Sequence, residues 1–352
     1  MTGIIHHYRD YLPLLNDNCI VSLGEGNTPL IRLNNIEKQF SLPIQLYAKV
    51  EGANPTGSFK DRGMTLAVSN ALAQGKQAII CASTGNTSAA AAAYAARANL
   101  KAFVVIPEGK IAKGKLMQAY IHGAVVIQIK GNFDQGLAIV KKIAEDERIE
   151  LVNSLNPYRI PGQQTAAYEI VDLLQRAPDY HYLPIGNGGN TTAYWQGYET
   201  YRKADKHEKS PKMVSCQAEH AAPFVLGHFV EAPETIATAI RIGKPAYWQQ
   251  SNEAVKTSGG HFMSCTDGEI IKAQQLIAAQ EGIFCEPASA ASIAGLLKDL
   301  QAGKIQEHAL IVCTLTGNGL KDTQLVEQTL DFDLHNVDAD YNKIQKLIFS
   351  FV

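Results

Sequence analysis

The sequence of 352 residues contains few cysteines, and none has the spacing of a metal or disulfide module. The six cysteines are scattered, with no Cys-x-x-Cys pair. This argues against a zinc site or a disulfide scaffold and is typical of a reducing cytosol. Three of them, Cys81, Cys285 and Cys313, lie in apolar runs that resemble strands. Because a thiol in such a run behaves as a small buried hydrophobe, we expect these cysteines in the core.

Charged tracts and long apolar runs are also missing. The 32 lysines and arginines balance 34 acidic residues to a net charge of −2, so neither nucleic acid nor a membrane surface is expected as a partner. No uncharged apolar run reaches the length of a membrane span. The first residues lack the apolar core of a signal peptide, and we expect a cytoplasmic protein. The ten histidines show no metal-ligand spacing, which predicts no metal.

What the sequence does contain is a regular alternation of short apolar strands and longer helical patterns. Such alternation predicts an α/β fold, with parallel sheets covered by helices on both faces. The length suggests about two domains. Residues 53–155 form a self-contained strand–helix series and are predicted as a small domain, with 1–52 and 156–352 as a larger one. The expected strands and helices are 45–50, 59–74, 77–82, 87–98, 102–106, 110–121, 125–129, 133–147, 151–152, 165–176, 180–185, 191–204, 267–281, 282–285, 288–300 and 309–314.

One lysine stands at an unusual position. Lys60 falls in the first turn of the helix predicted over 59–74, after a turn rich in Asn, Pro, Gly and Ser. The positive end of a helix disfavours a second positive charge, and burial would add to this by lowering the lysine pKa. A neutral amine at this position can form a Schiff base with an aldehyde cofactor. Taken alone, a solvated surface lysine is the commoner outcome.

Two further strand-to-helix turns could bind anions. The turn 83–88 is rich in hydroxyl residues, and the turn 184–191 has three glycines in four positions. Backbone N–H groups converge at such helix starts and favour a carboxylate or phosphate. An ordinary helix cap explains the first turn equally well by itself, and a structural turn explains the second. The second turn lacks the Gly-x-Gly-x-x-Gly of dinucleotide-binding folds.

Five segments together resemble one enzyme family. They are Pro55-Thr-Gly-Ser-Phe-Lys60-Asp-Arg, Ser83-Thr-Gly-Asn-Thr87, Gly186-Asn-Gly-Gly-Asn190, Thr314-Leu-Thr316-Gly-Asn318 and Asn153-Ser-Leu-Asn-Pro-Tyr-Arg159. They are similar, in the same order, to segments of the fold type II (β-family) pyridoxal-phosphate enzymes, which share the tryptophan synthase β-like fold. Within that family the segments resemble those of the threonine synthases most. These often carry His where this chain has Asn318, so the role of Asn318 stays open.

The resemblance implies a role for each segment. Lys60 would hold pyridoxal 5′-phosphate and act as the catalytic base, and Asn86 would contact the ring hydroxyl. The loop Gly186, Asn187, Gly188, Gly189 and Asn190 would bind the cofactor phosphate, and Thr316 would face the pyridine nitrogen. The expected substrate ligands are Ser83, Thr84 and Thr87 for the carboxylate, and Asn153, Ser154 and Arg159 for a phosphate leaving group.

The same resemblance implies a lyase that converts O-phospho-L-homoserine and water to L-threonine and phosphate, acting as a homodimer. Arginine suits bidentate phosphate binding, although a surface ion pair is the commoner fate of a single Arg. Two alternatives stay open. A serine/threonine dehydratase or a β-replacement enzyme of the same fold would need no phosphate pocket at 153–159. A non-catalytic amino-acid or anion sensor would need no Lys60.

Overall fold

A computed structural model describes residues 3–13, 15–108, 113–329 and 334–351. The chain forms two compact units, Met1–Asp322 and Thr323–Val352. The described residues of the second unit include the helices α13 (Thr323–Thr329) and α14 (Tyr341–Phe349). The first unit contains both β-sheets and every segment of the predicted site. The finer division predicted at residues 53 and 155 stays a prediction.

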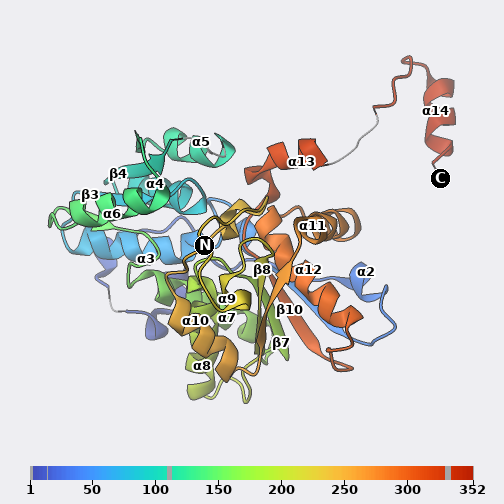
Figure 1. Cartoon of the computed structure of the whole chain (residues 1–352), viewed down its shortest axis with the longest axis horizontal. Helices are drawn as coiled ribbons and strands as arrows, with labels where there is room; N and C mark the ends of the chain where they lie inside the picture. The colour runs from blue at the N-terminus through green and yellow to red at the C-terminus, as the bar shows by residue number, and fades with distance from the viewer. Residues whose placement is uncertain (1–2, 14, 109–112, 330–333, 352) are drawn as a thin grey trace. The chain divides into compact units, whose positions relative to one another are not determined.

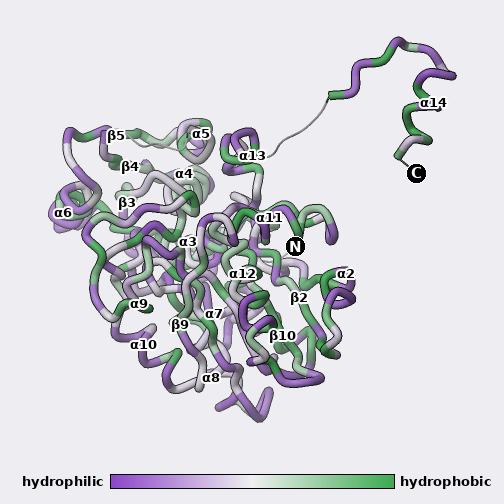
Figure 2. Tube along the Cα trace, turned by 45° about the vertical axis from the view of Figure 1, so that its right-hand side comes forward, coloured by the Kyte–Doolittle hydropathy of each residue, from purple (hydrophilic) through white to green (hydrophobic). Residues whose placement is uncertain are grey.

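The larger sheet has six strands in the order β1-β2-β10-β7-β8-β9. Only β1 runs antiparallel to its neighbour β2, and the other neighbouring pairs are parallel. The strands are β1 (Leu30–Arg32), β2 (Gln45–Val50), β7 (Tyr180–Pro184), β8 (Lys212–Ala218), β9 (His261–Cys265) and β10 (Leu310–Leu315). Every residue of β10 is buried, as expected of a central parallel strand with both faces covered, and the hydrophobic run is visible in Figure 2.

The smaller sheet has four strands in the order β5-β4-β3-β6, all parallel. They are β3 (Ala78–Ala82), β4 (Lys101–Pro107), β5 (Val125–Ile129) and β6 (Ile149–Leu151). Consecutive residues of β3 face opposite sides of this sheet. Ile79 and Cys81 join the core formed with α3 and α4, whereas Ile80 packs in the core beneath α6. Helices therefore cover both faces.

Helices also cover both faces of the larger sheet. On β10, Ile311 and Cys313 belong to the core that includes α11 and α12, whereas Val312 belongs to the core that includes α7 and α8. Figure 1 labels β10 and these four helices. The helices of this unit are α1 (Ile4–His7), α2 (Asn34–Glu37), α3 (Lys60–Ala73), α4 (Asn86–Arg97), α5 (Lys113–Ile121), α6 (Phe133–Ile143), α7 (Arg159–Leu174), α8 (Gly189–Lys203), α9 (Pro223–Leu226), α10 (Trp248–Thr257), α11 (Asp267–Glu281) and α12 (Pro287–Gln301). Among the described residues, no helix is both long and apolar enough to cross a bilayer.

These elements confirm the predicted α/β class with parallel sheets, and most predicted elements agree with the structure within a few residues. The expected strand 282–285 is wrong, because Gly282 adopts a left-handed φ of +68° and Cys285 forms only an isolated bridge to Asn318. Helix α7 begins at Arg159 rather than at 165. Its Pro161 lies in the first turn, where a missing N–H costs no helical hydrogen bond. Cys81, Cys285 and Cys313 are buried as predicted.

Candidate active site

Three predicted cofactor segments meet at one edge of the larger sheet. Lys60 follows β2, Gly186 to Asn190 follow β7, and Thr316 follows β10. Because β2, β10 and β7 are adjacent and parallel, their carboxyl ends lie side by side. The Phe59 amide donates to the Thr316 carbonyl at 3.0 Å, which joins the lysine turn directly to the end of β10. Parallel sheets of this kind bind their ligands at this edge.

Lys60 is the first residue of α3, as predicted, and its side chain is partly buried. Its Nζ lies 4.0 Å from the centroid of the Phe59 ring. Burial, together with the nearby Arg159 guanidinium, lowers the pKa of Lys60 to about 7, and the Glu286 carboxylate opposes both effects. The lowered pKa agrees with the expectation from the sequence, which named burial as a contributor, and Arg159 is a further cause that the sequence did not indicate. Near neutral pH, a large fraction of Lys60 is a free amine.

The glycine loop 186–190 is shaped by close contacts. Gly188 has a left-handed φ of +84°, and a Cβ there would lie 2.3 Å from the Ser251 Oγ. The Asn187 Oδ1 accepts a hydrogen bond from the Ala246 amide at 3.2 Å. By contrast, the Nδ2 of Asn190 is buried and has no hydrogen-bond partner within the described residues. A buried donor without a partner is costly, which points to a ligand acceptor at this position.

Thr316 is buried just past the end of β10. Its Oγ1 shares a hydrogen bond with the Ser289 Oγ at 2.9 Å, and the Gly317 amide donates to the same Ser289 oxygen at 2.9 Å. The Thr316 hydroxyl, which the resemblance predicts to face the pyridine nitrogen, is therefore paired with the Ser289 hydroxyl. The Asn318 side chain accepts from the Leu320 amide at 2.9 Å and so caps a short 3-10 turn.

The predicted substrate segments end two adjacent strands of the smaller sheet. Ser83, Thr84 and Thr87 follow β3 and are partly buried around the first turn of α4. Asn153 follows β6, and its side chain forms two hydrogen bonds with the Ala82 main chain, both at 2.9 Å. The amide of Asn153 thus fastens the ends of β3 and β6 to each other. Asn153 could contact a substrate phosphate only through the second N–H of its Nδ2, since the first is used by the Ala82 carbonyl.

Arg159 is the first residue of α7 and only 1% exposed. Its Nη1 donates to the Val152 carbonyl at 2.8 Å, whereas its Nε is buried without a partner among the described residues. Burial lowers the pKa of Arg159 to about 10, so the guanidinium stays charged at neutral pH. Its charge gives this part of the site a positive potential that favours an anion.

Sequence reasoning missed Tyr247, which precedes α10. Its hydroxyl donates to the Ser154 carbonyl at 2.6 Å, and its amide donates to the Asn187 carbonyl at 3.0 Å. A Cβ on Gly189 would lie 3.4 Å from the Tyr247 ring. Tyr247 therefore contacts both the glycine loop and the segment that contains Arg159. No strand-to-helix turn rich in glycine or hydroxyl residues marks Tyr247 in the sequence.

Helix α3 is anchored behind Lys60 by buried ion pairs. Arg62 contacts Glu51 and Glu169, each at 2.7 Å, and Lys49 contacts Glu169 at 2.6 Å. All four side chains are at most 7% exposed. Two positive and two negative charges balance, and Thr28 adds a hydrogen bond from its hydroxyl to Glu51 at 2.7 Å. Such a network fixes the first turn of α3, which carries Lys60.

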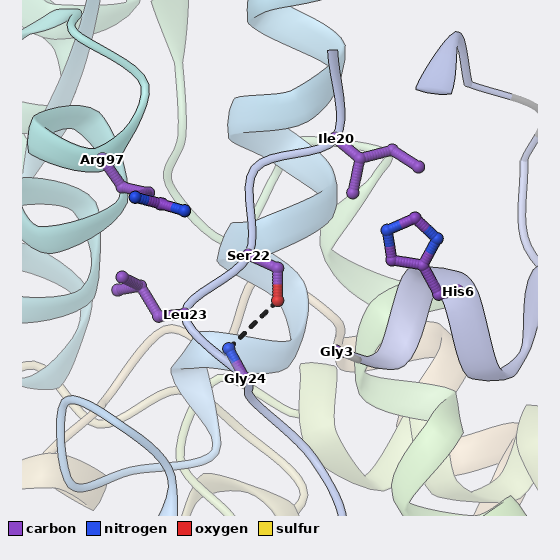
Figure 3. A pocket seen from close by; sticks show the side chains of 7 residues that line it. All are labelled: Gly3, His6, Ile20, Ser22, Leu23, Gly24 and Arg97. Carbon is purple, nitrogen blue, oxygen red and sulfur yellow. Dashed lines mark hydrogen bonds between the residues drawn. The ribbon is translucent and has the colours of Figure 1, made fainter. Parts of the chain in front are cut away.

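A separate hollow lies away from these groups, between the N-terminal segment and α4 (Figure 3). His6, Ser22 and Arg97 line it, and none of the predicted site residues does. Figure 3 shows the hydrogen bond that the Gly24 amide donates to the Ser22 Oγ, which is 3.0 Å long. The candidate active site is therefore the cluster around Lys60 and Arg159, and not this hollow.

The donor set fits pyridoxal phosphate. An amine with a lowered pKa, a glycine cradle and an unpartnered buried amide donor are the groups needed for its aldehyde and its phosphate. Residues 21–317 match the family described as pyridoxal-phosphate dependent enzyme. The chain belongs to this family, and its cofactor is pyridoxal 5′-phosphate.

Several threonine synthases align with almost the whole chain. A threonine synthase of Bacillus sp. (strain ULM1) is 54% identical over 343 residues, 97% of each protein. A threonine synthase of Mycobacterium tuberculosis (strain H37Rv) is 58% identical over 321 residues, 91% of this chain and 89% of the relative. Among solved structures, maize serine racemase superposes with a TM-score of 0.76 at 19% identity, covering 93% of this chain and 97% of that one. This last likeness concerns the fold alone.

Proposed function

We propose that this protein is a carbon–oxygen lyase of threonine biosynthesis, which converts O-phospho-L-homoserine and water to L-threonine and phosphate. Identities of 54–58% to several threonine synthases support this function. One structural observation carries the choice of substrate. The Nε of Arg159, in the segment that follows β6, is buried and has no hydrogen-bond partner in the part of the chain that the structure describes. A substrate phosphate would accept a hydrogen bond from this donor, whereas the substrate of a serine/threonine dehydratase carries no phosphate.

The cofactor would be held by residues from both sheets. Its aldehyde would bind the amine of Lys60, its phosphate would bind the loop from Gly186 to Asn190, and Thr316 would face the ring nitrogen. Asn86 would contact the ring hydroxyl. Pyridoxal phosphate supplies an electron-withdrawing ring that weakens the bonds of a substrate α carbon. A threonine hydroxyl at the ring nitrogen, in place of a carboxylate, would not enforce protonation there.

The substrate would be bound at both ends. Ser83, Thr84 and Thr87 would hold its carboxylate at the start of α4, where the helix favours negative charge. Ser154 and Arg159 would hold the phosphate, with Asn153 fixing the ends of the two strands beneath. Arg159 keeps its charge at neutral pH, so it would also stabilise phosphate as it leaves.

Lys60 would move the protons. Its pKa of about 7 lets the Nζ accept a proton from the substrate α carbon at neutral pH. A second proton leaves the β carbon, and phosphate departs from the γ carbon. The γ carbon then gains a proton and water adds at the β carbon. Lys60 finally returns a proton to the α carbon, which completes threonine.

We further propose that the enzyme acts in the cytoplasm as a homodimer, with residues 53–155 as its small, substrate-binding domain. A homodimer is the arrangement implied by the sequence resemblance, and closed two-fold pairs are the commonest oligomers of soluble proteins.

The test is to supply the purified protein, loaded with pyridoxal phosphate, with O-phospho-L-homoserine or with L-threonine. We expect phosphate and threonine from the first and little 2-oxobutanoate from the second. Lys60→Ala should abolish turnover, and Arg159→Gln should chiefly raise KM for the phosphorylated substrate. The surface residue Arg202, changed to Gln, is the matched control. Rapid 2-oxobutanoate formation from threonine without phosphate release from phosphohomoserine would favour the dehydratase instead.

The sensor alternative has its own test. Borohydride reduction of the loaded protein, followed by peptide mass spectrometry, should place a pyridoxyl group on the peptide that contains Lys60. A protein that only senses amino acids would have no adduct at Lys60.

A further inference from the structure

Glu286 lies inside the candidate site although the proposed function assigns it no role. It precedes α12 and is fully buried. Both of its carboxylate oxygens accept hydrogen bonds from the Asn86 Nδ2, at 2.9 and 3.1 Å. Glu286 and Asn86 are 200 residues apart and belong to opposite sides of the site, because Asn86 begins α4 over the smaller sheet.

The position of the Glu286 carboxylate is fixed by its surroundings. The Glu286 amide donates to the Gly317 carbonyl at 3.0 Å. A Cβ on Gly317 would lie 2.5 Å from the Glu286 Oε1, so the glycine that follows Thr316 is required to make room for the carboxylate. The carboxylate is therefore built into the end of β10, next to the place proposed for the cofactor ring.

The bond to Glu286 also decides which way the Asn86 amide faces. An ionised carboxylate only accepts hydrogen bonds, so the amide must turn its nitrogen toward it. The Asn86 Oδ1 is then buried and has no partner among the described residues. A neutral side chain at position 286 could either accept or donate, and the Asn86 amide would lose this constraint.

The carboxylate acts on Lys60 as well. The charged groups that influence Lys60 in the described part of the chain are Arg159, from α7, and Glu286. Arg159 disfavours a positive charge on the lysine nitrogen, and Glu286 favours one. Asp61 and Tyr247 act on Arg159 in turn. The buried carboxylate of Glu286 thus partly offsets the effect of Arg159 on Lys60.

We propose that Glu286 is a positioning residue of the active site, whose carboxylate orients the Asn86 amide toward the cofactor ring and favours a positive charge on the Lys60 nitrogen. The inference rests on the proposed binding of pyridoxal phosphate at Lys60, and it does not depend on which substrate is used. It predicts two separable effects, one of charge at Lys60 and one of orientation at Asn86.

Glu286→Gln in the loaded enzyme tests the charge. The variant keeps the shape of the side chain and an acceptor for Asn86, but it removes the negative charge. We expect full cofactor occupancy, and a pH titration of the visible absorbance of bound pyridoxal phosphate whose midpoint falls by about one pH unit. Glu286→Asp keeps the charge and should retain a midpoint near that of the wild type. Glu307→Gln, at an exposed carboxylate, is the matched control.

The orientation effect is tested by a double-mutant cycle with Asn86→Ala. Glu286→Gln alone should lower kcat/KM about tenfold. In the Asn86→Ala background the further loss in kcat/KM should be much smaller, because no amide remains to be oriented. The fall in the absorbance midpoint should persist, because the charge effect does not pass through Asn86.

The outcomes separate this inference from the proposed function. A wild-type midpoint for Glu286→Gln at full occupancy would overturn it, and so would a lowered midpoint for Glu286→Asp, which serves if the Gln variant does not fold. If the Gln variant bound less cofactor, and the cofactor that remained bound titrated with the wild-type midpoint, Glu286 would have a purely structural role. That result would also overturn the inference. A lowered midpoint in a protein that does not turn over O-phospho-L-homoserine would retain the inference and reject the proposed substrate.

Discussion

The hydroxyl of Tyr247 donates a hydrogen bond of 2.6 Å to the main-chain carbonyl of Ser154. The two residues are 93 positions apart and come from segments that follow different sheets. Through this bond, the chain that enters α10 holds the segment proposed to bind the substrate phosphate. The aromatic ring meanwhile lies against the glycine loop. Tyr247 thus sets the spacing between the proposed sites for the cofactor phosphate and the substrate phosphate.

Removal of that hydroxyl should weaken substrate binding while cofactor binding is retained. Tyr247→Phe leaves the Ser154 carbonyl without this donor, and a net loss of about 1 kcal/mol is typical of a neutral hydrogen bond. We expect KM for O-phospho-L-homoserine to rise about 2- to 10-fold, with a smaller change in kcat. The bond from the Tyr247 amide to Asn187 is a main-chain contact and should survive. An unchanged KM in steady-state kinetics would contradict this role for the hydroxyl.

The two asparagines of the glycine loop should behave differently. Among the residues that the structure describes, the Nδ2 of Asn190 is buried without a partner, whereas the Asn187 side chain accepts a hydrogen bond from the Ala246 amide. Asn190→Ala should therefore weaken pyridoxal phosphate binding about 10- to 100-fold, the range of a hydrogen bond to a charged group. Asn187→Ala is the control within the same loop and should weaken binding less. Equilibrium titration of cofactor-free protein gives both affinities, and equal losses would argue against the distinction.

The sequence predicted the positions of the loops well, for a physical reason. Each motif that contains Lys60, Asn86, Gly188 or Thr316 joins a strand to the turn or helix that follows it, and the carboxyl ends of parallel strands gather at one edge. The order of the strands, with β10 between β2 and β7, comes from long-range pairing. No local pattern specifies that order.

The contacts of Tyr247 and Glu286 could not be predicted in the same way. Each acts through a contact that spans a long stretch of chain, 93 residues to Ser154 and 200 residues to Asn86. Neither stands in a strand-to-helix turn rich in glycine or hydroxyl residues. Strand β9 was missed because His261 to Cys265 lack the branched residues that mark a buried strand, and the edge position of β9 leaves most of it partly exposed.

Cofactor loading should depend on pH through Lys60. Only the neutral amine attacks an aldehyde, and burial together with Arg159 lowers the pKa of Lys60 to about 7. The rate at which cofactor-free protein binds pyridoxal phosphate should therefore rise with pH and level off above about pH 8. Stopped-flow absorbance would record this rate. A rate that still rises steeply toward pH 10 would indicate a lysine of ordinary pKa.

Glu169 should stabilise the fold in a way that is lost in acid. Burial alone would raise its pKa, but Arg62 and Lys49 lower the pKa of Glu169 to about 2, from 4.5. Since the folded-state pKa is depressed, the stabilisation is complete above about pH 4.5 and disappears as the pH falls toward 2. Wild type should lose stability over this window by up to about 3 kcal/mol more than Glu169→Gln. Urea unfolding at several pH values measures the difference, and parallel curves would contradict the assignment.

Asp61 should show the opposite sign, although it lies in the first turn of α3 beside Arg62, the ion-pair partner of Glu169. Burial raises the pKa of Asp61 to about 7, from 3.8, against hydrogen bonds from Thr56 that lower it. Because its folded-state pKa is raised, Asp61 binds a proton more tightly in the folded protein than in the unfolded one. The resulting stabilisation is complete below about pH 3.8 and is lost as the pH rises toward 7.

Asp61→Asn tests this, because the amide oxygen can still accept from Thr56 while no charge develops. Relative to the variant, wild type should lose stability between about pH 4 and 7, opposite in direction to the effect of Glu169. The variant itself should show a flatter unfolding profile over that window. Because the two carboxyl groups titrate in different windows, urea unfolding across pH resolves them in one protein. If Asp61→Asn instead behaved like Glu169→Gln, the carboxyl would have to be paired with a positive charge rather than held in a desolvated site.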